Sequence, residues 1–197
     1  MIRYKLLRID GSGVKYEAFY AADETSSLTF MNDINPRFLV NSLLVTYYVS
    51  IWERYLADSY IAIVRHDGLE NAENVKLSLE RDDLETITAG NTTVEETLTR
   101  NLSFQRPSIV AGNFRAIDRD LDIAGSLKRP YHRRKKSLFE SIDNYIDLRN
   151  EIAHMGHSDT CPTDGSTDAI ASDFVAAVER VYEEFASHYR FTPLRGY

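Results

Sequence analysis

Apolar side chains recur at steps of three and four residues in the stretch that follows Asn35. They are Val45, Tyr48, Val49, Trp52, Leu56, Tyr60 and Ile63. This spacing puts them on one face of a helix, because an α-helix turns by about 100° per residue. Asn35 followed by Pro36 is a typical helix start, with a capping side chain before a proline at the first helical position. The pattern predicts an amphipathic helix that runs to about Arg65 and stops at Gly68.

The same periodicity and several capping patterns predict further helices. Thr93 and Glu96 form a capping-box pattern, and Ser137 and Glu140 form a second one at the start of the most regular helix in the chain. Gly156 is the expected stop of that helix. The predicted segments are residues 71–87, 93–102, 138–155 and 168–189.

The remaining segments carry weaker patterns. Residues 107–129 mix glycine, proline and aspartate with short apolar pieces, so we expect loops with one or two helical turns. Residues 2–22 favour two short β segments around a glycine-containing turn, although "YKLLRI" also fits the start of a helix. The sum is a mostly α protein. It has a bundle of four to five helices over residues 35–190, an N-terminal extension over 1–34 that includes the candidate β-hairpin, and a tail over 191–197.

Composition narrows the class of protein. The 197 residues are 43% hydrophobic and 27% charged, which is typical of a soluble globular protein. With 23 Lys and Arg against 30 Asp and Glu, the net charge is −7, so any contact with nucleic acid would have to be local. The single cysteine, Cys161, forms no internal disulfide and fits a reducing compartment. No signal peptide and no membrane-spanning run is evident, so we expect a cytoplasmic protein with no membrane partner.

Arg149 stands where the most regular predicted helix needs an apolar residue. The apolar stripe around it consists of Ile142, Tyr145, Ile146, Ile152 and Ala153. A buried guanidinium without a partner would be costly, so either its stem packs while its head reaches solvent, or it pairs with a buried carboxylate. Asn150 and His154, four residues apart, share a face of the same helix. A cation, an amide and an imidazole together suit chemistry on a phosphate.

The stretch "LRNEIAHMG" resembles the signature of the HEPN superfamily (higher eukaryotes and prokaryotes nucleotide-binding). Arg149, Asn150 and His154 match that signature position for position, late in a helix of an all-α bundle. The stretch "LLVTYYVSIWERYLADSY" is similar to the opening helix of the bacterial branch related to RNase L and PrrC-type ribonuclease domains. The resemblance covers residues 35–189.

This resemblance implies a metal-independent endoribonuclease without a cofactor, which acts as a homodimer with two motifs lining one cleft. The ribose 2′-hydroxyl would attack the adjacent phosphate and leave a 2′,3′-cyclic phosphate. His154 would serve as general acid or base, Arg149 would stabilise the phosphate, and Asn150 would position it. Relatives act as toxins or antiviral effectors. Gly156 replaces a tyrosine that some such toxins carry, which puts one known kind of antitoxin pairing in doubt.

Three other features bear on the site. A basic segment, with aromatic residues between its charges, suits local RNA contact, although a solvated loop would look the same. It contains Lys128, Arg129, Arg133, Arg134, Lys135 and Lys136. Glu53 lies near the apolar side of the first helix, where it would pair either with Arg149 or with a surface neighbour such as Arg54. His154, His157 and Cys161 are too few and too loosely spaced for a zinc site.

Two other functions fit the same residues. One is a non-catalytic HEPN-like subunit that binds nucleotide or RNA, or serves dimerisation within a larger defence or toxin–antitoxin complex. The other is a helical scaffold in which Arg149 only forms a structural ion pair.

Overall fold

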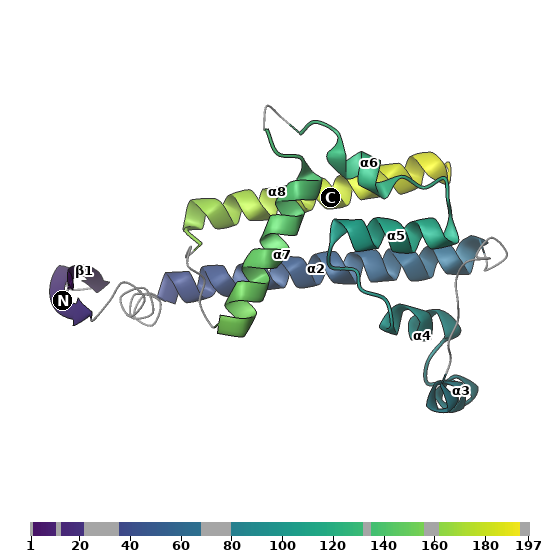
Figure 1. The fold of residues 1–197 in the computed structure, drawn as a ribbon, viewed down its shortest axis with the longest axis horizontal. Helices are drawn as coiled ribbons and strands as arrows, with labels where there is room; N and C mark the ends of the chain where they lie inside the picture. Colours follow the sequence, from purple (N-terminus) through teal and green to yellow (C-terminus); the bar gives the residue numbers. More distant parts are fainter. Residues whose placement is uncertain are drawn as a thin grey trace.

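The computed structural model of the chain describes residues 2–10, 13–21, 36–67, 80–131, 135–155 and 162–193. These residues are mostly helical (Figure 1). The two strands are β1 (Ile2–Asp10) and β2 (Gly13–Ala21), and the helices are α2 (Pro36–Asp67), α3 (Arg81–Thr88), α4 (Val94–Arg100), α5 (Pro107–Ile117), α6 (Ile123–Lys128), α7 (Leu138–Met155) and α8 (Asp164–His188). β1 pairs with β2 in antiparallel register, from Ile2 opposite Ala21 to Asp10 opposite Gly13.

The long helix α2 is the axis of the bundle, and α7 and α8 both pack on it. Figure 1 shows α5 and α8 running roughly along α2, while α7 crosses it within its N-terminal half. The predicted apolar stripe of α2 forms the centre of the core, with Val45, Val49, Trp52 and Leu56 fully buried. The predicted helix is therefore confirmed.

Capping chemistry sets helix ends where the sequence predicted them. Thr93 and Glu96 satisfy each other's backbone N–H groups at the start of α4. Ser137 and Glu140 do the same at the start of α7, which spans the predicted residues 138–155. At α8 the prediction was four residues late, because Thr163 caps the helix by accepting a hydrogen bond from the Ser166 N–H.

The prediction of loops over residues 107–129 was wrong. Pro107 occupies the first position of α5, and this helix buries Val110, Phe114 and Ile117. Asp122 then caps α6 by accepting a hydrogen bond from the Gly125 N–H. Helix α5 is short and its apolar face is filled by tertiary contacts, which periodicity over so few residues does not reveal. The described residues accordingly form seven helices, where the sequence predicted four to five.

Two further predictions are only partly addressed. Of the helix predicted over 71–87, the structure has α3 from Arg81 to Thr88, and residues 68–79 lie outside the described ranges. The predicted stops at Gly68 and Gly156 lie outside them as well. Within the described residues, no helix is long and apolar enough to cross a membrane.

Candidate active site at the contact between α2 and α7

Arg149 joins α7 to α2 through an ion pair with Glu53. The Arg149 Nη2 and Glu53 Oε1 atoms lie 2.7 Å apart, and the two side chains are 19% and 28% exposed. Ile142 and Ile146, on the same face of α7, are fully buried, so the guanidinium lies at the edge of the core. Of the two partners considered for Glu53, the structure has Arg149. The neighbouring Arg54 instead pairs with Asp58 at 2.8 Å.

Asn150 holds the other end of the guanidinium. The Arg149 Nη1 group donates a hydrogen bond to Asn150 Oδ1 at 3.1 Å. The Nε group of Arg149 is buried, and no acceptor meets it in the described part of the chain. The planar guanidinium is thus fixed from two sides, and its charge is partly balanced by Glu53. Such a group is positioned before any substrate arrives.

His154 lies one turn further along, in the last turn of α7, and its side chain is exposed. It is therefore accessible to a substrate. No hydrogen bond links it to Arg149 among the described residues, so this single copy presents the imidazole and the guanidinium as neighbours on one helix, without a direct bond. The chemistry open to this arrangement is proton transfer by an exposed His154 on the same helix as a fixed cation.

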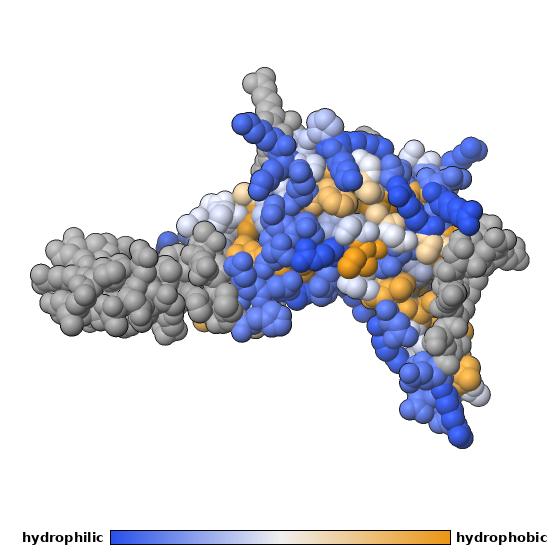
Figure 2. All heavy atoms as spheres, viewed as in Figure 1, coloured by the Kyte–Doolittle hydropathy of each residue, from blue (hydrophilic) through white to orange (hydrophobic). Residues whose placement is uncertain are grey.

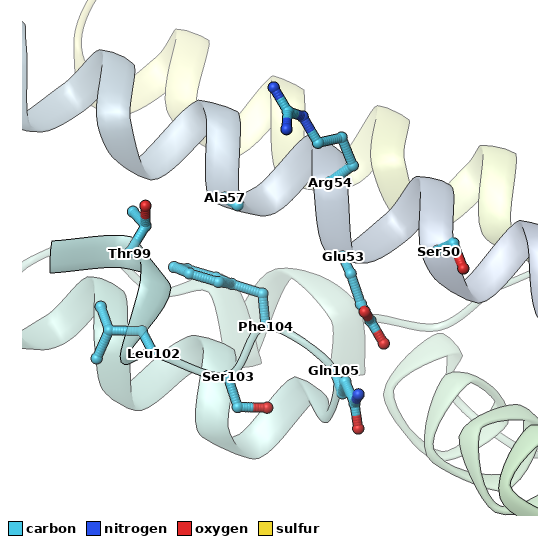
Figure 3. A pocket seen from close by; sticks show the side chains of 9 residues that line it. All are labelled: Ser50, Glu53, Arg54, Ala57, Thr99, Leu102, Ser103, Phe104 and Gln105. Carbon is cyan, nitrogen blue, oxygen red and sulfur yellow. The ribbon is translucent and has the colours of Figure 1, made fainter. Parts of the chain in front are cut away.

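A hollow of about 490 Å³ opens beside Glu53 and was not predicted. Figure 3 shows the Glu53 and Gln105 side chains at one end of it and Phe104 beneath α2. Trp52 Nε1 donates to the Gln105 carbonyl at 3.0 Å, and Asn113 Nδ2 donates to the Ser103 carbonyl at 2.8 Å, so the segment after α4 is held rigidly. The lining residues are Ser50, Glu53, Arg54, Ala57, Thr99, Leu102, Ser103, Phe104 and Gln105.

Arg106 ties the same segment to α7. Its Nη1 group contacts Asp143 at 2.8 Å and its Nη2 group contacts Asp147, one turn apart on α7. The hydrogen bonds that Arg106 donates to the Asp147 and Asp143 carboxylates raise the pKa of its guanidinium. The sequence carries no local signal for this clamp, since Arg106 lies 37 and 41 residues from the two aspartates. It ties α7 to the segment before α5 and balances part of the charge of the two carboxylates.

The basic segment is described only in part, because Arg133 and Arg134 lie outside the described residues. Lys128, Lys135 and Lys136 are exposed and line a groove of about 570 Å³ together with Tyr131 and Phe139. The Lys128 ammonium lies 4.7 Å from the centre of the Phe139 ring. Arg129 pairs with Glu184 at 2.9 Å and is thereby partly neutralised. A cationic, aromatic groove of this kind suits contact with a nucleic-acid backbone.

This groove and the Arg149 motif lie at opposite ends of α7. The 11 residues from Leu138 to Arg149 correspond to about 17 Å along the helix. The basic segment leads directly into the helix that carries the motif, and within one copy the length of α7 separates the groove from Arg149. The intervening surface carries Asp143 and Asp147, whose two charges the single Arg106 guanidinium balances only in part. An RNA that used both sites would have to span several nucleotides.

Arg180 on α8 holds the entrance to the groove in place. It donates to the backbone carbonyls of Arg129 and Pro130, both at 2.6 Å, and its guanidinium lies 5.4 Å from the centre of the Tyr131 ring. These charge-assisted hydrogen bonds hold a segment that has no regular secondary structure of its own. The groove therefore has a defined shape in the fold.

Among the described residues, no three His, Cys, Asp or Glu side chains gather around a common point. His157 and Cys161, the other members of the weak metal pattern, lie outside them.

The fold and site together define a mostly helical protein in which a partly buried Arg–Glu pair fixes a cation near an exposed histidine. Comparisons of this chain with protein-family models, with curated proteins and with solved structures gave no match.

Proposed function

We propose that the chain is a metal-independent endoribonuclease of the HEPN type, with Arg149, Asn150 and His154 in the active site of a homodimer. The observation that carries this proposal is the Arg149 guanidinium, which Glu53 and Asn150 hold in place. The exposed His154 follows Arg149 by five residues on the same helix. A helix rarely places a charge in its apolar stripe unless the charge has a partner or a purpose, and here the contacts with Glu53 and Asn150 use two of the five N–H donors of the guanidinium.

In the proposed reaction the ribose 2′-oxygen forms a bond to the adjacent phosphorus while the bond from phosphorus to the 5′-oxygen breaks. His154, or its counterpart in the second copy, accepts the 2′-hydroxyl proton or donates a proton to the leaving 5′-oxygen. Arg149 balances the charge that develops on the phosphoryl oxygens. The products are a 2′,3′-cyclic phosphate and a 5′-hydroxyl. The proposed step requires neither a metal nor a cofactor. The role of such an enzyme would be that of a toxin or an antiviral effector in the cytoplasm.

The basic segment would bind a part of the RNA that lies at a distance from the reacting phosphate. The proposal assigns backbone contacts to Lys128, Arg129, Arg133, Arg134, Lys135 and Lys136. Support comes from the exposed lysines around the aromatic groove and from the anchoring of its loop by Arg180. Because the chain carries a net charge of −7, this local patch would account for most of the salt dependence of RNA binding.

The test is an RNA cleavage assay on the full chain with a matched pair of histidine variants. His154 and His66 are both exposed and both lie in the last turn of a long helix. His154→Ala should reduce cleavage of tRNA or single-stranded RNA by at least a hundredfold, whereas His66→Ala should leave it unchanged. Cleavage should persist in EDTA, and mass spectrometry should find cyclic phosphate ends. Intact RNA with the pure wild-type protein under varied conditions would overturn the enzyme proposal.

The alternative is a non-catalytic HEPN-like subunit that binds nucleotide or RNA, or that assembles with an antitoxin or a defence complex. What favours it is that Glu53 already occupies one edge of the Arg149 guanidinium. In that case neither wild-type nor His154→Ala protein cleaves RNA, and both bind it equally. The purely structural alternative predicts that Arg149→Lys, which keeps the charge but loses the planar fork, lowers the melting temperature and alters nothing else.

A further inference from the structure

One face of α2 exposes large apolar side chains along its N-terminal half. Leu39, Leu43, Tyr47 and Ile51 follow one another at four-residue steps and are 58%, 59%, 62% and 45% exposed, and Val40 beside them is 52% exposed. These residues point away from the core, since Val45, Val49 and Trp52 on the opposite face are fully buried. We call these five residues the α2 stripe.

The sequence around the α2 stripe is also free of charge. No Asp, Glu, Lys or Arg occurs between Arg37 and Glu53, although about half of that stretch is exposed to solvent. Exposed helix faces normally carry charged side chains, and the centres of protein interfaces are depleted of them. By contrast, the next turns of α2 expose Arg54, Asp58 and Arg65. The exposed surface therefore changes from apolar to charged along one continuous helix.

We propose that the α2 stripe is the contact surface between two copies of this chain, related by a twofold axis. This inference says where the two copies of the proposed homodimer would meet. It rests on the proposed function only in linking that interface to catalysis. Ridges of side chains at four-residue spacing can pack into the grooves of an identical helix, so the stripe is complementary to a copy of itself. With the axis between Leu43 and Tyr47, the leucine of each copy lies against the tyrosine of the other.

The area of the stripe fits this partner. Five large side chains, each about half exposed, present on the order of 500 Å² of apolar surface, which is the size of the largest apolar patch on a typical monomer, and such patches are often binding surfaces. Two copies together reach the roughly 1,000 Å² that a specific interface needs. Helix α7, which carries Arg149 and His154, crosses α2 within this same half of the helix (Figure 1). A dimer built here would place its contact along the same half of α2 that α7 crosses, far from α3 and α4.

The rest of the surface provides a comparison for the α2 stripe. Figure 2 shows that the described part of the face seen in Figure 1 is largely hydrophilic, with apolar patches between the helices. Leu84 on α3 is one exposed leucine elsewhere, with 52% exposure, and α3 lies at the other end of the molecule in Figure 1. It offers a control of the same residue type and nearly the same exposure as Leu43.

The test is sedimentation equilibrium of the full chain over a wide concentration range. Wild-type protein and Leu84→Glu should be dimers in the micromolar range, while Leu43→Glu should weaken the dimer by about thirtyfold or more, as expected for a residue at the centre of an interface. Circular dichroism checks that each variant is folded. A wild-type protein that stays monomeric at the highest concentrations, or a folded Leu43→Glu that dimerises like wild type, overturns the proposal.

A second measurement does not depend on a disruptive substitution. In a Cys161→Ser background, Leu43→Cys combined with Tyr47→Cys should form a covalent dimer under mild oxidation, and Leu84→Cys should not. Equal cross-linking in the two variants counts against the α2 stripe. RNA cleavage is assayed separately. A stripe dimer that never cleaves RNA refutes the proposed ribonuclease and leaves the interface standing, whereas RNA cleavage by a dimer that Leu43→Glu does not weaken refutes the α2 stripe and leaves the ribonuclease standing.

Discussion

Replacing Glu53 by glutamine tests how the site is held together. The substitution keeps the shape of the side chain and removes the charge that faces Arg149 Nη2 at 2.7 Å. The guanidinium would then remain at the edge of the core with a neutral acceptor, and its buried Nε group already lacks an acceptor among the described residues. The folded state therefore loses an interaction that the unfolded chain never had.

The magnitude follows from the burial of the pair. Breaking a fully buried ion pair costs about 3–5 kcal/mol, and breaking an exposed one costs about 0–1 kcal/mol. Because the two side chains are 19% and 28% exposed, the pair lies between these limits, and we expect a loss of about 2 kcal/mol. For a chain of this length such a loss lowers the melting temperature by about 4–8 °C.

The matched control is Asp58→Asn on the same helix. Asp58 pairs with Arg54 at 2.8 Å, nearly the same distance, but the two side chains are 51% and 79% exposed. The same change from carboxylate to amide should therefore cost less than about 0.5 kcal/mol. Urea denaturation of both variants, followed by circular dichroism, gives the comparison directly.

The combination of Glu53→Leu with Arg149→Met extends the test. If the cost of Glu53→Gln arises from a stranded cation, removing both charges should restore most of the lost stability, since neither partner is left unpaired. The reasoning would be refuted if Glu53→Gln proved no more destabilising than Asp58→Asn, because burial of the pair would then have no measurable consequence.

Two further predictions concern pH. Burial pushes the pKa of Asp118 upward, but the hydrogen bond from His188, with smaller contributions from Asp120 and Tyr189, holds it below its usual value of 3.8. Since the pKa is lower in the folded state, the stabilisation is complete above the unfolded value and is lost as the pH falls through the folded one. Denaturation curves below about pH 4 should therefore fall more steeply for wild type than for Asp118→Asn, and parallel curves would contradict the assignment. Burial raises the pKa of Tyr55 to about 12, so the unfolded chain ionises first and stability should decline from about pH 10 upward. Tyr55→Phe should make that alkaline decline shallower, and an unchanged slope would show that Tyr55 does not contribute.

Local patterns predicted the elements whose ends depend on neighbouring residues. The helix start at Pro36 and the capping boxes of Thr93 and Ser137 involve side chains within four positions of one another, so the sequence specifies them without any tertiary contact. The long stripe of α2 is repeated over enough turns to be unambiguous. Helix α5, with 11 residues, was missed because its apolar face is filled by distant residues such as Phe185 on α8.

In the candidate site, too, local sequence spacing predicted some residues and tertiary contacts decided the others. Arg149, Asn150 and His154 were found because they lie within six residues on one helix. The Glu53 partner was only one of two alternatives, since 96 positions separate it from Arg149 and sequence distance does not say which helix faces meet. The basic segment was predicted to lead into the motif helix, and that helix then separates the groove from Arg149 by about 17 Å.

The sequence by itself determined where the main helices begin and which helix carries a charge in its apolar stripe, because these properties depend on spacing along the chain. Only the tertiary structure decided that Glu53 meets Arg149, that Arg106 clamps α7, and that one apolar face of α2 remains uncovered. Residues 38–52 are apolar on both sides of the helix, and although the longer stripe predicted one buried side, the pattern does not say whether the other side is covered as well. That choice is made by the helices that pack against α2, and it leaves the α2 stripe exposed.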